Sequence, residues 1–314
     1  MARILITGAN GFVGARIAEA ARSAGHDVLS IAGPHSPAET LRVDVSEKTS
    51  VAALRTYGDM DAVVHAAGIA HRTRGVSAQE LHKVNALGPQ YTAELAAVCG
   101  TKRFVLISSV LVYGRSGRVP GKFVSESDAC SPDHPYAESK LDGERLAAQA
   151  CAAAGIAFTA LRPAPIIGER GKGNFDRLMR AIASGRFIRI GRGSNRRTLV
   201  YVGDVADAAV KCAVESLHGT FNLGAPPITM HEIVDEISIA FGRRPPKTYV
   251  STEVGQAAAN VLQALPLTRE RGSTLSNWLA EDIYSTDAAT AAGIGAKTPI
   301  REAIQLAVDE FRDQ

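Results

Sequence analysis

The sequence predicts an α/β protein with a doubly wound parallel sheet, and three observations support this fold class. Short apolar runs alternate with stretches that are rich in Ala, Leu and Glu, which is typical of a parallel sheet covered by helices on both faces. The first apolar run passes directly into a glycine-rich turn and then into a helical pattern. Because strand–helix–strand connections are nearly always right-handed, the doubly wound arrangement is the expected one.

The apolar runs place the expected strands of this sheet. They are Arg3–Thr7, Asp27–Ala32, Asp61–His65, Arg103–Ser108 and Ile156–Leu161. Each has the length of a buried strand and is followed by a turn or a helical stretch. Two long helices are expected over Ser77–Cys99 and Tyr136–Ala154.

The pattern changes after residue 162, where Gly, Arg and Pro become frequent and the helical pieces become shorter. These pieces are Phe175–Ser184, Thr229–Phe241 and Pro299–Arg312. We therefore expect a large domain over residues 1–162 and a smaller C-terminal α/β lobe over residues 163–314. Residues 195–223 are expected to return to the large sheet.

The composition excludes several classes of protein. The chain has 314 residues, of which 46% are hydrophobic and 21% charged, and its net charge is +3. This is an ordinary globular composition, and the charge is too small to imply nucleic-acid binding. The four cysteines form no C-x-x-C pair, so we expect reduced thiols in a cytoplasmic protein, without a disulfide frame or a metal site. Neither a signal peptide nor a membrane-spanning run is expected.

The glycine-rich turn at Gly8, Gly11 and Gly14 predicts a dinucleotide site. Glycines let the backbone approach a pyrophosphate, and the N-terminus of the following helix presents unpaired N–H groups and a positive dipole to its charge. The spacing is G-x-x-G-x-x-G, and a glycine triplet by itself is weak evidence. The strand before it and the helix after it make cofactor binding the stronger interpretation.

Ser109, Tyr136 and Lys140 indicate redox chemistry on an alcohol or a ketone. On a helix, Tyr136 and Lys140 are four residues apart and share one face. A phenol with a pKa of about 10 is a poor base at neutral pH, but a neighbouring ammonium favours the phenolate and lowers that pKa. A serine hydroxyl directly after a strand can hold the substrate oxygen while hydride moves to or from a nicotinamide.

The glycine turn, the serine and the Tyr-x-x-x-Lys helix, in this order, resemble the extended short-chain dehydrogenase/reductases, and within them the nucleotide-sugar epimerase/dehydratase group. The resemblance covers nearly the whole chain. It implies a Rossmann fold, NAD or NADP as cofactor, and catalytic roles for Ser109, Tyr136 and Lys140. The cofactor-binding residues that it implies are Gly8, Asn10, Gly11, Phe12, Val13, Gly14, Asp44, Val45, His65, Ala66, Ala67, Gly68, Asn85, Ser108, Tyr136, Lys140 and Pro163. Within this set we expect His65 to pack and to form hydrogen bonds, and Asn85 to be structural.

The second half resembles the same group at its substrate-binding segments. Residues 173–175, Gly-Asn-Phe, resemble the helix start that holds sugar-nucleotide phosphates, and residues 191–205 resemble a block whose arginine, here Arg197, grips the diphosphate. The implied substrate-binding residues are Ser109, Asn174 and Arg197. Asp204 is expected to cap the following helix. Residues 268–278 loosely resemble the ribose-binding segment of the group.

The two residues after Ser109 narrow the reaction. Dehydratases of the group carry Asp-Glu there to move protons, whereas this chain has Val110 and Leu111, which cannot. Hydride transfer at C4 of a hexose is therefore expected, and a UDP-sugar 4-epimerase is the leading hypothesis. The alternatives are an NADPH-dependent 4-keto-sugar reductase of the UDP-4-keto-6-deoxy-N-acetylhexosamine type, a steroid- or flavanone-type ketone reductase, and a catalytically silent NAD(P)-binding protein.

The sequence leaves the choice between NAD and NADP open. The second strand ends at Ala32-Gly33 without the acidic residue that binds the ribose 2′-hydroxyl of NAD. Candidate contacts for a 2′-phosphate are His35, Ser36 and Arg42. Members of the group commonly dimerise through their two long helices, so the resemblance also implies a homodimer.

Overall fold

The computed structural model describes residues 1–34, 36, 41–70, 75–115, 119–169, 171, 173–185, 187–247, 249–254 and 279–313. Six parallel strands form the central sheet, in the order β10-β5-β4-β3-β1-β2. They are β1 (Arg3–Thr7), β2 (Asp27–Ile31), β3 (Ala62–His65), β4 (Arg103–Ile107), β5 (Ala157–Pro163) and β10 (Gly219–Leu223). The predicted fold class is confirmed, and the chain changes direction across the sheet between β1 and β3.

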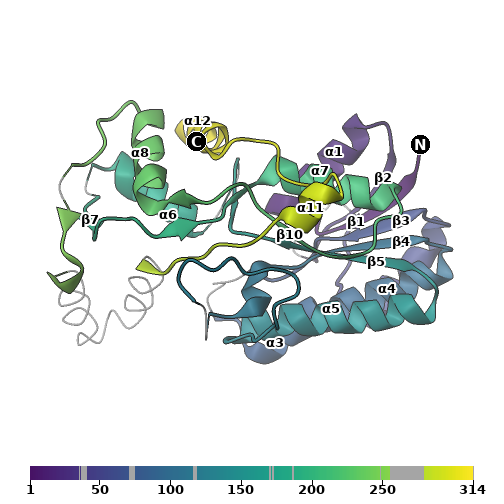
Figure 1. The fold of residues 1–314 in the computed structure, drawn as a ribbon. Coiled ribbons are helices and arrows are strands. Elements are labelled where there is room, and N and C mark those ends of the chain that lie inside the picture. Colours follow the sequence, from purple (N-terminus) through teal and green to yellow (C-terminus); the bar gives the residue numbers. More distant parts are fainter. Residues whose placement is uncertain are drawn as a thin grey trace.

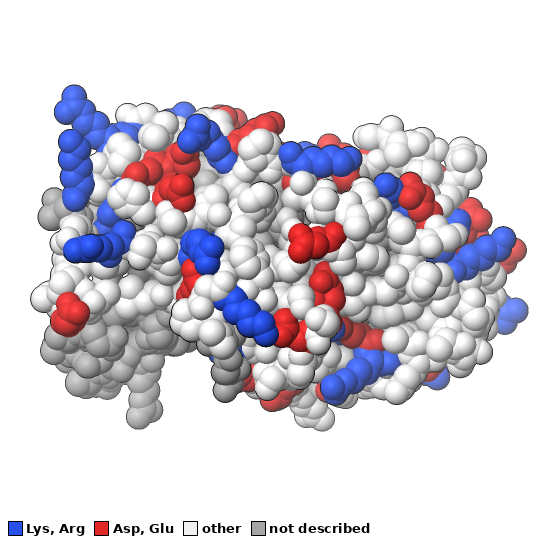
Figure 2. Space-filling model, in the orientation of Figure 1, with Lys and Arg blue, Asp and Glu red and all other residues white. Residues whose placement is uncertain are grey.

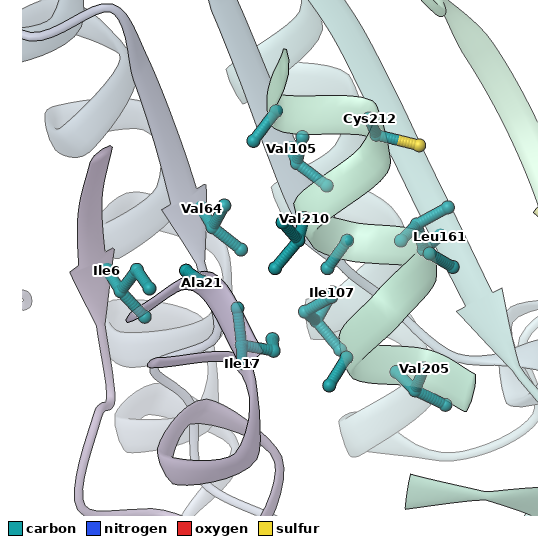
Figure 3. Packing of buried hydrophobic residues seen from close by; sticks show 14 of the residues in the cluster. Ile6, Ile17, Ala21, Val64, Val105, Ile107, Leu161, Val205, Val210 and Cys212 are labelled. Atoms are coloured by element: carbon teal, nitrogen blue, oxygen red, sulfur yellow. The ribbon is translucent and has the colours of Figure 1, made fainter. Parts of the chain in front are cut away.

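Helices cover both faces of the sheet (Figure 1). On one face lie α1 (Phe12–Ser23) and α7 (Val202–Val214), and on the other lie α4 (Gly88–Val98) and α5 (Pro135–Ala153). Figure 3 shows Ile17 of α1 and Val210 of α7 packed against strand residues such as Val105. Because both faces are covered, the strands are continuous apolar runs and not alternating ones.

The helix expected over residues 77–99 is present, but it is interrupted. It begins at α3 (Ala78–His82) with a capping box in which the Ser77 hydroxyl accepts from the Glu80 N–H while Glu80 accepts from the Ser77 N–H. A π-helical turn, η2 (Lys83–Leu87), follows before α4. Such turns often occur at functional positions, and this one carries the predicted structural residue Asn85. The shorter elements α2 (Lys48–Ala52), η1 (Ala53–Tyr57) and η3 (Val110–Tyr113) complete this half.

The second half contains the three shorter helices that the sequence predicts, α6 (Asn174–Ala183), α8 (Met230–Ala240) and α12 (Ile300–Arg312). Their apolar faces meet in a separate core, where Ile237 and Ile304 are fully buried. In Figure 1 α6 and α8 lie beyond one end of the central sheet. The remaining elements are β6 (Ile166–Ile167), β7 (Arg189–Ile190), β8 (Arg196–Arg197), β9 (Val200–Tyr201), β11 (Ile228–Thr229), β12 (Tyr249–Val250) and α11 (Asp287–Ala291).

Asp204 does not cap α7 as expected. It lies within the first turn of the helix, 7% exposed, and its carboxylate accepts from the Thr298 N–H at 3.1 Å and from the Thr298 hydroxyl at 3.0 Å. It therefore ties the segment before α12 to α7. The expectation was wrong because the partner lies 94 residues away in the chain, where local spacing gives no signal.

Charged side chains of both signs are interspersed over the face drawn in Figure 2, in keeping with the small net charge of +3. Within the described ranges, every helix is too short or too polar to cross a membrane.

Candidate active site

The predicted site residues gather at the carboxyl ends of the central strands. Gly8 follows β1, residues 66–68 follow β3, and Ser108 and Ser109 follow β4. β1 and β3 are neighbours in the sheet, and the chain runs to opposite sides from them. In open α/β sheets, ligands bind outside the strand ends at such a switch point.

The glycine turn leaves no room for a side chain at Gly8 or at Gly14. A Cβ on Gly14 would lie 2.1 Å from the Gly8 carbonyl oxygen, and one on Gly8 would lie 2.6 Å from the Ala67 backbone nitrogen. Gly8 also has a φ of 70°, which favours glycine. Among the described residues, no side chain caps α1 and its first turn holds no acid. The uncapped N-terminus of this helix therefore fits the pyrophosphate of a dinucleotide.

Helix α5 brings Tyr136 and Lys140 to the carboxyl ends of the central strands. His134 precedes the helix and accepts from the Ala137 N–H at 3.2 Å, and Pro135 occupies the first helical position. Tyr136 and Lys140 follow one turn apart. The Lys140 ammonium donates to the Ile107 carbonyl oxygen at 2.6 Å, and the Tyr136 and Ser109 side chains are hydrogen-bonded to each other. The structure thus brings together the three residues predicted to be catalytic.

Burial controls the protonation of both residues in the ligand-free protein. It raises the pKa of Tyr136 to about 12, although the hydrogen bond with Ser109 acts in the opposite direction. It lowers the pKa of Lys140 to about 8, while the charge of Glu144 acts to raise that pKa. At neutral pH the phenol is therefore protonated and the ammonium is charged, so a phenolate requires further positive charge nearby.

The segment after β3 is held by Asn85. The Asn85 side-chain oxygen accepts from the Ile69 N–H at 2.8 Å, and its nitrogen donates to the Ile69 carbonyl and to the Ser139 hydroxyl, both at 3.1 Å. It is the structural residue that we expected. His65 is fully buried and stacks on Phe104. Burial, followed by the charge of Lys140, lowers the pKa of His65 to about 3, so the ring is neutral. It packs as expected, but among the described residues neither ring nitrogen has the hydrogen-bond partner that we also expected.

Three further residues predicted to bind the cofactor, Asp44, Ser108 and Pro163, differ in what they leave available to a ligand. Asp44 is half-buried, and one of its carboxylate oxygens accepts from the Ser46 N–H at 2.9 Å and from the Ser46 hydroxyl at 2.7 Å, which leaves the second oxygen for a ligand. Ser108 is 4% exposed, and its hydroxyl donates to Glu144. Only the backbone of Ser108 is therefore left to contact a cofactor. Pro163 ends β5, next to the sheet edge.

Arg197 and Arg115 share one carboxylate. The two guanidinium groups contact the same oxygen of Asp282, at 2.5 Å and 3.1 Å. Asp282 is 3% exposed, so it holds both arginines from the buried side. Arg197 was predicted from the sequence, whereas Arg115 and Asp282 were not. Asn174 is the exposed first residue of α6, and the expectations for His35 and for residues 268–278 lie outside the described residues.

Sheet, glycine turn and Ser-Tyr-Lys arrangement define an enzyme of the extended short-chain dehydrogenase/reductase type that uses NAD or NADP. A family model described as the NAD dependent epimerase/dehydratase family matches residues 4–224. The chain belongs to this family.

Individual relatives are more distant. The N-acetyl-alpha-D-glucosaminyl-diphospho-ditrans,octacis-undecaprenol 4-epimerase of Escherichia coli O157:H7 is 26% identical over 80% of this chain and 76% of its own length. The UDP-glucose 4-epimerase of Vibrio cholerae is 29% identical over 67% of this chain and 66% of its own length. A solved structure, the UDP-glucose 4-epimerase of Thermus thermophilus in complex with NAD, is 25% identical, with 99% of both chains covered and a TM-score of 0.76.

Proposed function

We propose that this protein is a UDP-sugar 4-epimerase, which removes hydride from C4 of a hexose and returns it to the opposite face. One arrangement carries the proposal: Ser109 is hydrogen-bonded to Tyr136, Lys140 follows one helical turn later, and the glycine turn lies at the same carboxyl edge of the sheet. The residues after Ser109 support an epimerase over a dehydratase, because the side chains of Val110 and Leu111 cannot move a proton.

In this proposal, Tyr136 takes the proton from the C4 hydroxyl and later gives it back, while Ser109 holds the C4 oxygen by a hydrogen bond. Lowering the pKa of Tyr136 from about 12 to near neutrality requires about 7 kcal/mol. One opposite charge nearby typically lowers a pKa by about 1–3 units, so the Lys140 ammonium is not sufficient alone. NAD, when bound, supplies a hydride acceptor and a second positive charge.

The diphosphate of the substrate would lie against Arg115 and Arg197. Two guanidinium groups contact the Asp282 carboxylate, and guanidinium forks suit phosphate oxygens. We infer that residues 163–314, apart from the helix α7 and the strand β10, which pack with the large sheet, form the substrate lobe. The names of the Escherichia coli and Vibrio cholerae relatives both specify a 4-epimerase, one acting on a polyprenyl-linked sugar and one on a UDP-linked sugar.

The test is turnover of defined substrates. Purified protein with catalytic NAD is given UDP-glucose, UDP-N-acetylglucosamine or N-acetylglucosaminyl-diphospho-undecaprenol, and the C4 epimers are followed by NMR. We expect a UDP-sugar to be epimerised without net consumption of NAD. Turnover of the polyprenyl compound alone would contradict the UDP assignment. Oxidation of NADPH by a 4-keto sugar, without epimerisation, would establish the reductase instead.

A tyrosine pair separates chemistry from folding in this assay. Tyr136→Phe removes the only group proposed to move the C4 proton, so we expect a loss of about 10²–10⁴-fold in kcat with the fold unchanged. Tyr57→Phe makes the same change at a side chain that is 41% exposed, and it should retain full activity. Equal activity of the two variants would contradict the proposed role of Tyr136.

We further infer a homodimer that pairs α4 and α5 of one protomer with the same helices of its partner. A surface hollow between these helices is lined by Gln90, Glu94, Ala97, Leu146, Gln149, Ala150, Ala153 and Ala154. Val98 on α4 is 53% exposed. Five of these eight lining residues are Ala or Leu, which suits packing between helices of two copies.

A further inference from the structure

A buried ion pair lies directly behind the proposed catalytic residues. The Arg162 guanidinium donates twice to the Glu144 carboxylate, from Nη2 to Oε2 at 2.6 Å and from Nε to Oε1 at 3.0 Å. Both side chains are only 8% exposed. Burial opposes the charge of Arg162, but the hydrogen bonds and charge of Glu144 outweigh it and raise the pKa of Arg162. Arg162 therefore stays charged throughout the neutral pH range.

Through its hydrogen bonds, the Glu144–Arg162 pair connects α5 and β5 with the end of β4 and with η3. The Ser108 hydroxyl at the end of β4 donates to Glu144 on α5. Arg162 on β5 also donates to the Tyr113 phenol at 2.9 Å, and its guanidinium lies 4.9 Å from the centre of that ring. Tyr113, at the end of η3, donates in turn to the Asn222 side-chain oxygen at 2.8 Å.

This connectivity bears on the catalytic geometry at two points. Ser108 is the neighbour of Ser109 in the chain, so its bond to Glu144 fixes the end of β4 against α5. Glu144 lies one helical turn after Lys140 on α5 and therefore on the same face. Lys140 in turn donates to the Ile107 carbonyl at 2.6 Å, one residue before Ser108. The end of β4 is thus bound to α5 at two successive residues, directly before the proposed proton-transfer site.

We propose that Glu144, held by Arg162, is a positioning residue that keeps Lys140 charged and keeps Ser109 in line with Tyr136. The inference rests on the proposed function. Burying the Glu144–Arg162 ion pair costs desolvation energy, and apolar residues in its place are often as stable. A positioning role gives a reason for this pair that stability alone does not. Arg162 donates two hydrogen bonds to Glu144, so the carboxylate has a partner in the core.

The charged groups near Lys140 determine the direction in which its pKa moves when Glu144 is replaced. The ionisable groups around the Lys140 ammonium are Glu144 and Tyr136 on α5 and the neutral His65 on β3. Glu144 is the one that favours the ammonium. Without its charge, Lys140 loses its proton at lower pH than the value of about 8, and the uncompensated Arg162 adds repulsion. The proposed phenolate of Tyr136 then loses its partner within the working pH range.

The experiment compares Glu144→Gln, the double variant Glu144→Gln/Arg162→Gln, and Val210→Ala as a control for lost stability on the opposite face of the sheet. The titration of Lys140 is followed by NMR of labelled lysine side chains, and kcat is measured against pH with the UDP-sugar. We expect Glu144→Gln to lower the pKa of Lys140, and the alkaline limb of kcat, by about one unit or more. The double variant should show a smaller shift, and Val210→Ala none.

Each outcome decides the proposal. If Glu144→Gln does not fold because Arg162 is left unpaired, the double variant, which removes both charges, still reports the shift. An unchanged Lys140 titration in the folded variants, or a shift of equal size in Val210→Ala, would overturn the positioning role. Because the NMR titration needs no sugar, a shift without any epimerase activity would sustain the positioning role and count against the proposed function alone.

Discussion

Replacing Gly14 by Ala tests the cofactor turn directly. The added Cβ would lie 2.1 Å from the carbonyl oxygen and 2.6 Å from the carbonyl carbon of Gly8, whereas ordinary contact begins near 3.4 Å. The obstacle is backbone, so α1 and the turn would have to separate by about 1 Å, at a cost of about 3 kcal/mol or more. A displaced helix N-terminus no longer directs its N–H groups at the pyrophosphate, and we expect NAD to bind at least about tenfold more weakly.

Gly25→Ala is the matched control, just beyond the C-terminal end of α1. Gly25 follows the other end of α1 with a φ of 80°, and a Cβ there would meet nothing within 4 Å. The variant should lose about 1–2 kcal/mol of stability from backbone strain and keep its affinity for NAD. Calorimetric titration with NAD and urea unfolding separate the two effects. If Gly14→Ala bound NAD as tightly as the wild type, the proposed placement of the pyrophosphate would be refuted.

Three further predictions concern stability and assembly. Asp204→Ala should lower the free energy of unfolding by about 1–3 kcal/mol because it removes the hydrogen bonds that the buried carboxylate accepts from the Thr298 N–H and hydroxyl. The exposed Asp207→Ala should change it by about 0.5 kcal/mol at most, and urea unfolding would show whether the two differ. The pKa of His65 is about 3 in the folded chain and 6.5 ordinarily. Between these values the unfolded chain binds more protons, so stability falls as the pH drops through that window. His65→Asn should flatten this part of the pH–stability curve, and an unchanged slope would exclude His65 as the source of the pH dependence. Leu146→Glu should yield monomers in sedimentation velocity, and a dimer that persists would place the interface elsewhere.

Hydrophobic patterning was sufficient to predict five of the six strands of the central sheet. For the sixth, β10, only the return of residues 195–223 to the sheet was predicted. The strand ends differ from the expected ones by a residue or two; β4, for example, ends at Ile107 and not at Ser108. Such runs are visible because strands buried on both faces must be continuously apolar. The π-helical turn at η2 was not predictable in this way. It interrupts a helix whose residues have ordinary helical spacing. The feature that accompanies it is the hydrogen bonding of Asn85 to residues 69 and 139.

The candidate site was predictable where its residues are close in the chain. Tyr136 and Lys140 share a helix, and the glycine turn is a continuous segment. Contacts between distant residues were not predictable: Arg115 and Asp282 are 167 positions apart. Glu144 is intermediate, since its four-residue spacing from Lys140 was visible in the sequence. Its pairing with Arg162 and Ser108 required the structure.

The most direct test of the central claim is the fate of the hydrogen at C4. UDP-glucose that carries deuterium at C4 would be converted in ordinary water with unlabelled NAD, and the epimer would be analysed by NMR. If one site removes and returns the same hydride, the deuterium stays at C4 of the product. Loss of the label to water, or its replacement by hydrogen at C4, would contradict hydride return at this site.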